Sequence, residues 1–449
     1  MIVVDEANGA PGLHRPKGPF ERGPMLRLAE QDRPRGDGAI VVTGLGILSC
    51  NGLGRRAFWD ALREGRSGIG PIDRFDASEL PCRIAGQLRD FAPEDFMSRA
   101  TVKRWFRHVH QAIASARLAV EESELDAAGY PGERVAVAFG SSVGSPNEAY
   151  IEQQDVFLNA GYQAINRLGS TAFSIHSASV NVGIDFGLRG PHMTLSSGCA
   201  TGLDVLSWSV HQMRAGRADA VVMGATESPI FPMSVASAAS LGILSSRNDA
   251  PEKAMRPFDL DRDGIVLSEG AVALVLEYES RARARGAPIL AEVMGYGSAA
   301  EGRNALILDR SGDGLARAIR EALADAGISP HEVDHVQAHG ASMDMYDRCE
   351  TNAFKQVFGQ HAYRMPISGV KSMVGQTYSA GGLFGVAAAL LALDEGVVAP
   401  TINLDSPDPE CDLDYVSRHS RRNDIETAMT VAISFGGTHS AVVLRRARP

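Results

Sequence analysis

Apolar runs alternate with amphipathic stretches along most of the chain. Residues 39–49 (AIVVTGLGILS) are rich in β-branched residues and predict a buried strand. Residues 111–130 follow helical spacing, and residues 134–142 (RVAVAFGSS) form the next apolar run. Buried strands that alternate with amphipathic helices indicate an α/β fold.

The same order of elements recurs later in the chain. Residues 314–328 predict a helix and residues 335–342 the strand that follows it. Each half then contains a strand, a tight turn and a helix of small residues, at 192–210 and at 364–393. Such self-similarity indicates two related halves. We therefore expect the two strand-to-helix turns to face each other.

The pattern predicts three segments. Residues 1–38 are rich in glycine, proline and charge, lack hydrophobic periodicity, and predict a disordered N-terminal extension. This extension is expected either to be an inert tail or to bind a partner. The first half is expected over 39–286 and the second over 287–449, with the junction within 278–288.

Composition narrows the class of protein. The 449 residues are 44% hydrophobic and 22% charged, as in globular proteins, and the net charge of −10 argues against a nucleic-acid partner. The five cysteines include no CxxC pair, so we expect no disulfide framework, no metal site and a cytoplasmic location. No uncharged apolar run reaches the ~18 residues of a membrane span, and the N-terminus lacks a signal-peptide pattern.

The turn of the first half carries a candidate nucleophile. Cys199 follows a strand end at Ser197 within LSSGCATG. A cysteine on such a turn is expected to be exposed at a helix N-terminus, where free N–H groups and the helix dipole favour the thiolate. The alternative is a small buried cysteine, the usual state of a free thiol.

The second half supplies further polar candidates. His339 ends an apolar strand, where an imidazole can donate to a carbonyl oxygen or carry a proton; a core histidine is the alternative. Gln376 lies on the strand-to-helix turn. Asp347 and Glu350 share one predicted helix face, and Lys371 is predicted at the next strand end. A lysine buried near both carboxylates would hold a turn in place, whereas a solvated surface pair is the alternative.

Near the C-terminus, residues 432–440 (AISFGGTHS) predict a strand followed by a glycine turn. Such a turn lets backbone N–H groups point at a ligand, as an oxyanion hole requires.

The motifs occur in the order VVTGLG, GCATGLD, ADAVVMGATE, RPFDLDRDGIVLSEGA, QAHGAS, VKSMVG, APTINLDSPDPECDLDYV and SFGGTHSAVVL. Together they resemble the β-ketoacyl-acyl-carrier-protein synthases of the thiolase superfamily, over about residues 39–444. Residues 347–375 look most like the ketosynthase subunits of type II polyketide synthases. The resemblance implies a five-layered α-β-α-β-α fold of two related halves.

The resemblance also implies a chemistry. Cys199 would accept an acyl chain from the phosphopantetheine thiol of an acyl carrier protein, without a bound cofactor. A malonyl-carrier would then lose CO2, and the resulting enolate would attack the thioester. The backbone N–H groups of Cys199 and Phe435 would form the oxyanion hole, and Phe435 would gate the site. Lys371 and Glu350 match a supporting ion pair.

Partners follow from the same resemblance. The carrier of this family is acidic, and Arg99, Lys103 and Arg104 match the basic patch that docks it. Arg99 and Lys103 are four residues apart and would share a helix face. A solvated charged face is the alternative. The chain is expected to form either a homodimer or a heterodimer with a chain-length-factor subunit.

Four departures from the family pattern concern substrate handling. Gln376 replaces the second histidine of the reactive set; its amide can donate a hydrogen bond but cannot become a cation. Ala341 and Met343 replace two threonines of the HGTxT motif. Residues 304–309 read NALILD where the family pattern resembles NAYHMT. Ser434 replaces the first glycine of GFGG.

Three functions remain open on these residues. The first is a decarboxylating ketosynthase with a Cys199-His339-Gln376 set. The second is an acyltransferase or non-decarboxylative condensing enzyme, which the altered extender region motivates. The third is a structural partner subunit like the chain-length factors, against which the retained Cys199 argues.

Overall fold

The central sheet consists of two halves that have the same strand order. The computed structural model describes residues 38–125, 129–172 and 174–448, so the predicted N-terminal extension lies outside the described residues except for Gly38. The first five main strands, in spatial order, are β6 (His192–Leu195), β5 (Val135–Gly140), β7 (Ala220–Glu227), β8 (Gly270–Tyr278) and β1 (Ile40–Ser49). Their counterparts are β11 (Ile367–Ser368), β10 (His335–Gln337), β14 (Thr427–Ser434), β15 (Thr438–Arg446) and β9 (Ala291–Ala300).

Strand directions repeat as well. In each half the first three strands of this order are parallel, and the last two pair antiparallel. The halves join where β1 pairs antiparallel with β9 through Val41–Glu292 and Val42–Ala291. The internal repeat expected from the sequence is therefore confirmed in strand order and direction.

Alternate residues of each strand face different helices. In β5, Val135, Val137 and Phe139 belong to the core beneath α3 (Arg107–Ser123) and α6 (Ser177–Phe186). Ala136 and Ala138 face the opposite core, which contains α7 (Thr201–Arg214) and α13 (Gly381–Glu395). This period of two is that of a strand buried on both faces.

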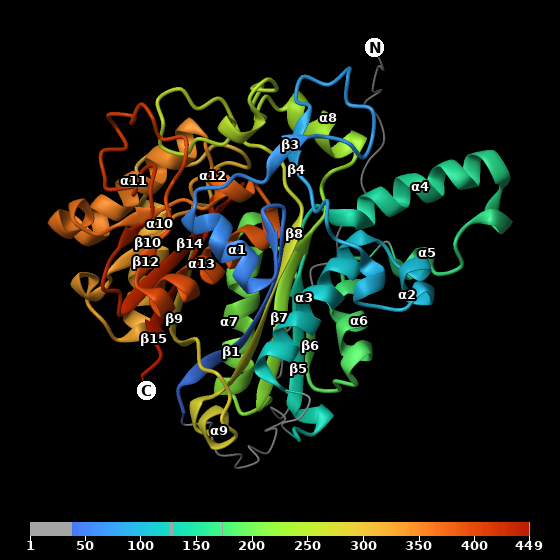
Figure 1. Ribbon diagram of the computed structural model, residues 1–449, viewed down its shortest axis with the longest axis horizontal. Helices are drawn as coiled ribbons and strands as arrows, with labels where there is room; N and C mark the ends of the chain where they lie inside the picture. The colour runs from blue at the N-terminus through green and yellow to red at the C-terminus, as the bar shows by residue number, and fades with distance from the viewer. Residues whose placement is uncertain (1–37, 126–128, 173, 449) are drawn as a thin grey trace, which may run out of the picture. The chain divides into compact units, whose positions relative to one another are not determined.

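The second half repeats this layering. Ala428 and Ala432 of β14 face α13, whereas Met429 and Val431 face the core of α10 (Asp313–Ala326) and α11 (Asp344–Phe358). Figure 1 shows α7 and α13 between the two parts of the sheet. The five layers are thus α3/α6, sheet, α7/α13, sheet and α10/α11, which confirms the expected α-β-α-β-α architecture.

Small residues explain how the two central helices meet. Every residue of α13 from Gly381 to Leu393 is buried, as expected for a helix with no solvent face. A Cβ added to Gly202 would lie 2.8 Å from Leu383 Cγ, and one added to Gly382 would lie 2.9 Å from Leu203 Cγ. The glycines therefore allow the N-terminal turns of α7 and α13 to approach closely.

The remaining elements are shorter or lie outside these layers. They are β2 (Gly52–Leu53), α1 (Gly54–Arg63), β3 (Ile69–Pro71), β4 (Ile84–Gly86), α2 (Arg99–Arg104), α4 (Gly144–Ala160), α5 (Gly169–Ala172), α8 (Pro232–Ser240), α9 (Glu279–Ala284), α12 (Lys371–Val374), β12 (Val397–Val398) and β13 (Arg421–Arg422). Among the described residues, no helix has the length and apolar character needed to cross a membrane. The predicted segment boundaries at 38/39 and 286/287 stay predictions.

Candidate functional site

The two strand-to-helix turns bring Cys199 and Gln376 together. Cys199 lies in a 3-10 turn, η5 (Gly198–Ala200), that leads into α7; Gln376 follows α12 and precedes the 3-10 turn η9 (Tyr378–Ala380) and α13. A glycine in the left-handed region precedes each residue: Gly198 has φ 64° and Gly375 has φ 77°. Gln376 Nε2 donates to Cys199 Sγ at 3.5 Å.

A neighbouring segment holds the backbone of Gln376. Its N–H donates to Val266 O at 2.8 Å, and its carbonyl accepts from Ser268 N–H at 2.9 Å. Gln376 Oε1 is buried and accepts no hydrogen bond from the described residues. An amide can present either its nitrogen or its oxygen to the same neighbour, so the Cys199 thiol can also donate to this oxygen. The side chain is therefore aimed at the sulfur, with its amide nitrogen as the donor.

Cys199 is a buried thiol. Only 3% of its surface is exposed, and burial raises its pKa to about 11, while Lys371 acts in the opposite direction. The expected exposed thiolate is therefore wrong. The turn does lie at a helix N-terminus, but the loss of hydration penalises the charged sulfur more than the nearby cation stabilises it.

His339 is held as a neutral imidazole. Its Nδ1 accepts the N–H of Ile433 at 3.2 Å, and Lys371 Nζ lies 2.9 Å from Nδ1 and 3.2 Å from Nε2. Burial and then Lys371 hold the pKa of His339 well below its ordinary value. With Nδ1 acting as acceptor, the single proton resides on Nε2, which can donate to a substrate oxygen. Burial also lowers the pKa of Lys371 to about 8.

Two buried carboxylates fix the turn that carries His339. Glu350 accepts the N–H groups of His339 at 2.5 Å and Gly340 at 2.9 Å, and Asp347 accepts that of Ala341 at 3.0 Å. Both side chains lie on α11 and are completely buried, so the alternative of a solvated surface pair is wrong. Burial raises the pKa of Glu350 to about 8 and that of Asp347 to about 6.

The expected ion pair between Lys371 and Glu350 is not direct. Within the described ranges, Lys371 Nζ lies against the imidazole of His339 and not within 4.0 Å of either Glu350 oxygen. The Glu350 oxygens are already engaged by backbone N–H groups, and Asp347 pairs with Arg262 at 3.4 Å. Lys371 also begins α12, three residues after the end of β11, and is not at a strand end.

A cavity of about 640 Å³ opens beside Cys199. Phe231, Tyr150 and Phe435 contribute aromatic side chains to its wall. Phe435 is half-buried and its ring meets that of Tyr346 edge-on, with centroids 6.1 Å apart. Tyr346 in turn stacks on His339 at 6.0 Å. No local pattern in the sequence marks Tyr346, because only packing between α11 and the β14–β15 turn brings it into the site.

One of the two expected oxyanion-hole donors is engaged. Cys199 N–H donates to the side-chain oxygen of Ser434 at 3.1 Å. Ser434 is the last residue of β14 and lies next to Phe435, the other expected donor. The sequence marked Ser434 only as a departure from a glycine motif.

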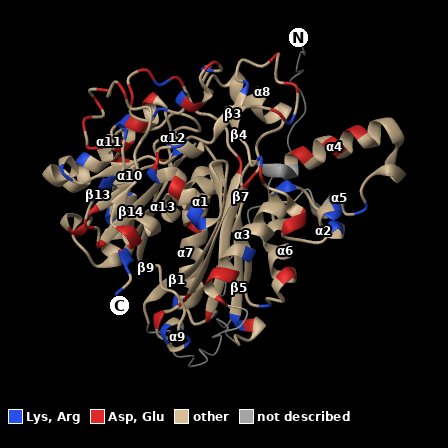
Figure 2. Cartoon of the chain, in the orientation of Figure 1, with Lys and Arg blue, Asp and Glu red and all other residues tan. Residues whose placement is uncertain are grey.

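The predicted docking residues lie on a separate element. Arg99, Lys103 and Arg104 are exposed on the short helix α2, which Ser98 caps by accepting Thr101 N–H at 3.2 Å. None of the three lines the cavity beside Cys199. Across the part of the chain that the structure describes, none of these cations lies within ion-pair distance of a carboxylate. Figure 2 shows basic residues on α2.

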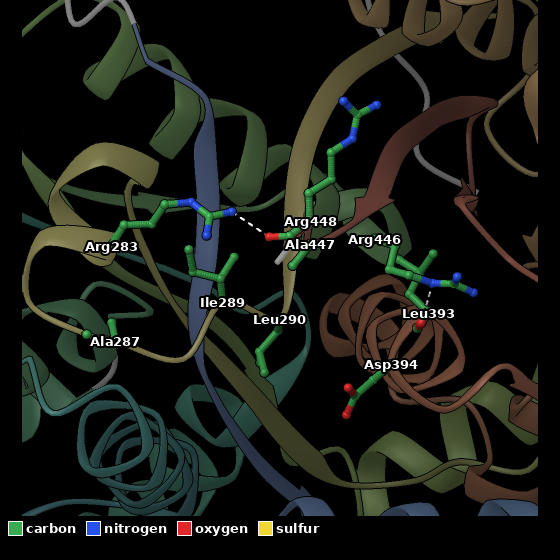
Figure 3. A pocket seen from close by; sticks show the side chains of 10 residues that line it. Arg283, Ala287, Ile289, Leu290, Leu393, Asp394, Arg446, Ala447 and Arg448 are labelled. Atoms are coloured by element: carbon green, nitrogen blue, oxygen red, sulfur yellow. Dashed lines mark hydrogen bonds between the residues drawn. The ribbon is translucent and has the colours of Figure 1, made fainter.

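A second cavity, of about 590 Å³, contains no predicted site residue (Figure 3). Two of its basic side chains already have partners: Arg283 donates to Arg448 O at 2.5 Å, and Arg446 donates to Leu393 O at 3.0 Å and pairs with Glu426 at 2.7 Å. The cavity beside Cys199 is therefore the better candidate for the substrate.

Comparisons with known proteins show the family of the chain. The family models "Beta-ketoacyl synthase, N-terminal domain" and "Beta-ketoacyl synthase, C-terminal domain" match residues 37–282 and 290–405. A relative from Coxiella burnetii, 3-oxoacyl-[acyl-carrier-protein] synthase 2, is 38% identical over 408 residues, which span 91% of this chain and 98% of the relative.

Two solved structures extend the likeness to the fold. One is a type II PKS acyl-carrier protein in complex with its ketosynthase bound to the hexaketide, with a TM-score of 0.84 and 33% identity over 92% of this chain and all of the other. The ishigamide ketosynthase/chain length factor gives a TM-score of 0.85 and 29% identity at the same coverage. With both domain models matched in order over most of its length, the chain belongs to the β-ketoacyl synthase family.

Proposed function

We propose that the chain is a β-ketoacyl-acyl-carrier-protein synthase of polyketide or fatty-acid-like assembly. The observation that carries this proposal is the position of Cys199 Sγ, 3.5 Å from the Gln376 amide and at the wall of a 640 Å³ cavity. A nucleophile beside a hydrogen-bond donor, next to a space for an acyl chain, suits transfer of an acyl group through a thioester.

In the first step, Cys199 Sγ attacks the thioester carbonyl of an acyl-carrier. The thiol proton passes to the departing phosphopantetheine sulfur, so a free thiol leaves and acyl-Cys199 remains. Burial raises the pKa of Cys199 to about 11, which favours movement of this proton during the transfer. The positive end of α7 and the Cys199 N–H stabilise the negative charge that develops.

In the second step, His339 Nε2 and the Gln376 amide donate to the thioester oxygen of a malonyl-carrier. The carboxylate leaves as CO2, and the enolate carbon attacks acyl-Cys199 to release the thiolate and a 3-ketoacyl-carrier. A neutral donor stabilises an enolate less than a charged donor does. The difference between the two, about 1 kcal/mol or more, corresponds to roughly tenfold in rate.

The proposal includes partners and location. An acidic carrier protein would dock on Arg99, Lys103 and Arg104, which have no ionic partner among the described residues. The acyl groups arrive on its phosphopantetheine, so the reaction needs no bound cofactor. A second subunit of the same fold, either another copy or a chain-length factor, would complete the enzyme. All five cysteines are free, which favours a cytoplasmic location.

Intact-protein mass spectrometry tests the two steps separately. We expect an acyl-carrier to add its acyl mass to Cys199, and malonyl-carrier then to remove it with release of CO2 and 3-ketoacyl-carrier. Cys199→Ala should abolish both the adduct and the product.

A stable adduct that malonyl-carrier cannot extend would overturn the ketosynthase assignment. It would instead support an acyltransferase or non-decarboxylative condensing enzyme, which the uncharged donor Gln376 already makes the second candidate. Absence of an adduct with every carrier would indicate a structural partner subunit.

A further inference from the structure

The hydroxyl of Ser434 occupies the position at which an acyl oxygen would meet the Cys199 amide. Ser434 Oγ accepts the Cys199 N–H at 3.1 Å, a distance at which oxyanion-hole donors meet an oxyanion. Ser434 is buried and lines the cavity together with Gly198, Cys199 and Phe435. Its oxygen therefore lies between the nucleophile's amide and the space that the substrate would enter.

The fit around this hydroxyl is close. A Cβ added to Gly198 would lie 2.0 Å from Ser434 Oγ, so only a glycine at position 198 leaves room for the hydroxyl in its present position. A carbonyl oxygen placed 2.7–3.1 Å along the Cys199 N–H direction would overlap the same hydroxyl, since one N–H cannot direct a short bond at two oxygens in the same place. The hydroxyl and the substrate oxygen thus compete for one donor.

We propose that Ser434 limits the acyl transfer to Cys199, because its hydroxyl occludes the oxyanion hole of the free enzyme and must rotate about χ1 before a thioester binds. This inference rests on the proposed function, in which the acyl group passes through a tetrahedral intermediate. In that intermediate the Cys199 Sγ–carbon bond has formed, the carbon–sulfur bond to the carrier has not yet broken, and the former carbonyl oxygen bears the negative charge.

The consequence is selective reactivity. A thioester that is well anchored in the cavity can displace the Ser434 hydroxyl from the Cys199 N–H. Water and weakly bound thioesters cannot displace it, so the oxyanion that they would form is not stabilised by this N–H. The device depends on two residues only: a serine at the end of β14 and a glycine before Cys199. Ser434 is therefore a residue that selects among substrates at the acylation step.

Two substitutions distinguish the effect of the Ser434 hydroxyl on acylation from the effect of its Cβ. Ser434→Ala removes the hydroxyl and keeps Cβ, and Ser434→Gly removes both. The rate of Cys199 acylation by an acyl N-acetylcysteamine thioester is followed by intact-protein mass spectrometry. We expect both variants to acylate about twofold to tenfold faster than the parent, because a competing neutral hydrogen bond of ordinary strength is lost.

A second reagent distinguishes this effect from a structural change. Iodoacetamide alkylates the same sulfur by direct displacement and forms no oxyanion, so its rate should stay within about twofold in both variants. Ser209→Ala is the matched control: it removes a buried hydroxyl that donates to Val205 O on α7, away from the cavity. It should change neither rate.

Slower acylation in Ser434→Ala would overturn the proposal, because the hydroxyl would then be donating to the oxyanion. Equal rates of Cys199 acylation in the parent and both Ser434 variants would also overturn the proposal, but they would leave the proposed function intact. If no form is acylated by the thioester, the proposed function and the occlusion both fail. If both Ser434 variants are acylated faster but no form then condenses with malonyl-carrier, the proposed occlusion is supported and the ketosynthase assignment is refuted.

Discussion

Burial sets the resting state of the residues around Cys199. It raises the pKa of the Cys199 thiol to about 11 and lowers the pKa of Lys371 to about 8. His339 stays neutral because burial and the adjacent Lys371 both oppose a positive charge on the ring. Burial therefore favours a thiol and an Nε2–H imidazole in the free site, next to Lys371.

The raised pKa of Cys199 predicts a steep pH dependence of alkylation. Only the thiolate attacks iodoacetamide, and its fraction grows about tenfold per pH unit as long as the pH is below the pKa. We expect the alkylation rate at Cys199, followed by peptide mass spectrometry, to rise continuously from about pH 6.5 to about pH 9.5. A plateau below about pH 8 would show a stabilised thiolate. Cys199→Ala identifies alkylation at the other cysteines.

Gln376 predicts a slow decarboxylation that a charged donor would accelerate. Gln376→His introduces an imidazole that can become a cation beside the enolate oxygen. We expect CO2 release from malonyl-carrier to rise about tenfold. Gln376→Met keeps much of the volume without a donor and should lower the rate. Equal rates for glutamine and histidine would mean that this residue does not limit the step.

At the scale of elements, the end of β14 connects the two reactive residues. The N–H of Ile433 fixes His339 Nδ1, and the hydroxyl of the next residue, Ser434, holds the Cys199 N–H. The helix α11 acts on the same site through Glu350, which fixes the His339 turn. One strand end and one helix thus decide the tautomer of His339 and the access to the oxyanion hole.

The helix α2 carries the prediction on carrier docking. The double variant Arg99→Glu/Lys103→Glu reverses two exposed charges on one face of the helix. We expect the KM for acyl-carrier to rise about tenfold at low salt and the difference to shrink at high salt, with kcat nearly unchanged. Activity toward a free N-acetylcysteamine thioester should not change.

Arg56→Glu provides a matched control for charge reversal, since the Arg56 side chain is 97% exposed on α1. An equal rise in KM for this control would mean that the net charge of the protein, and not a docking surface on α2, determines how tightly the carrier binds.

At the scale of the whole molecule, the edge of the sheet lacks a partner. In the described chain β6 pairs only with β5, and its outer backbone groups have no neighbouring strand. The adjacent helix α6 exposes Ile184 at 71%, and Met193 of β6 is also exposed. An unpaired edge beside exposed apolar side chains favours association with a second subunit.

Ile184→Arg is expected to weaken this association. In the homodimer of the proposed function, a charge placed in an apolar interface stays unpaired, so the variant should shift from dimer to monomer in light scattering coupled to size exclusion. Leu260→Arg, at another exposed apolar position, should behave like the parent chain. An unchanged mass for Ile184→Arg would place the interface elsewhere.

Local patterns by themselves determined the α/β class, the internal repeat, and the turns that carry Cys199 and Gln376. Each of these depends on short-range periodicity and on glycines such as Gly198 and Gly375, whose backbone conformation is a local property. The resemblance of ordered motifs added the family, and the pairing of His339 with these turns followed from it.

Only the tertiary structure decided the state of the site. Burial raises the pKa of the Cys199 thiol, and Lys371 faces His339 instead of Glu350, whose oxygens accept the N–H groups of the turn after β10. The engagement of the Cys199 N–H by Ser434 joins residues 235 positions apart in the chain. Desolvation and long-range contacts depend on all the layers at once, so no local pattern carries them.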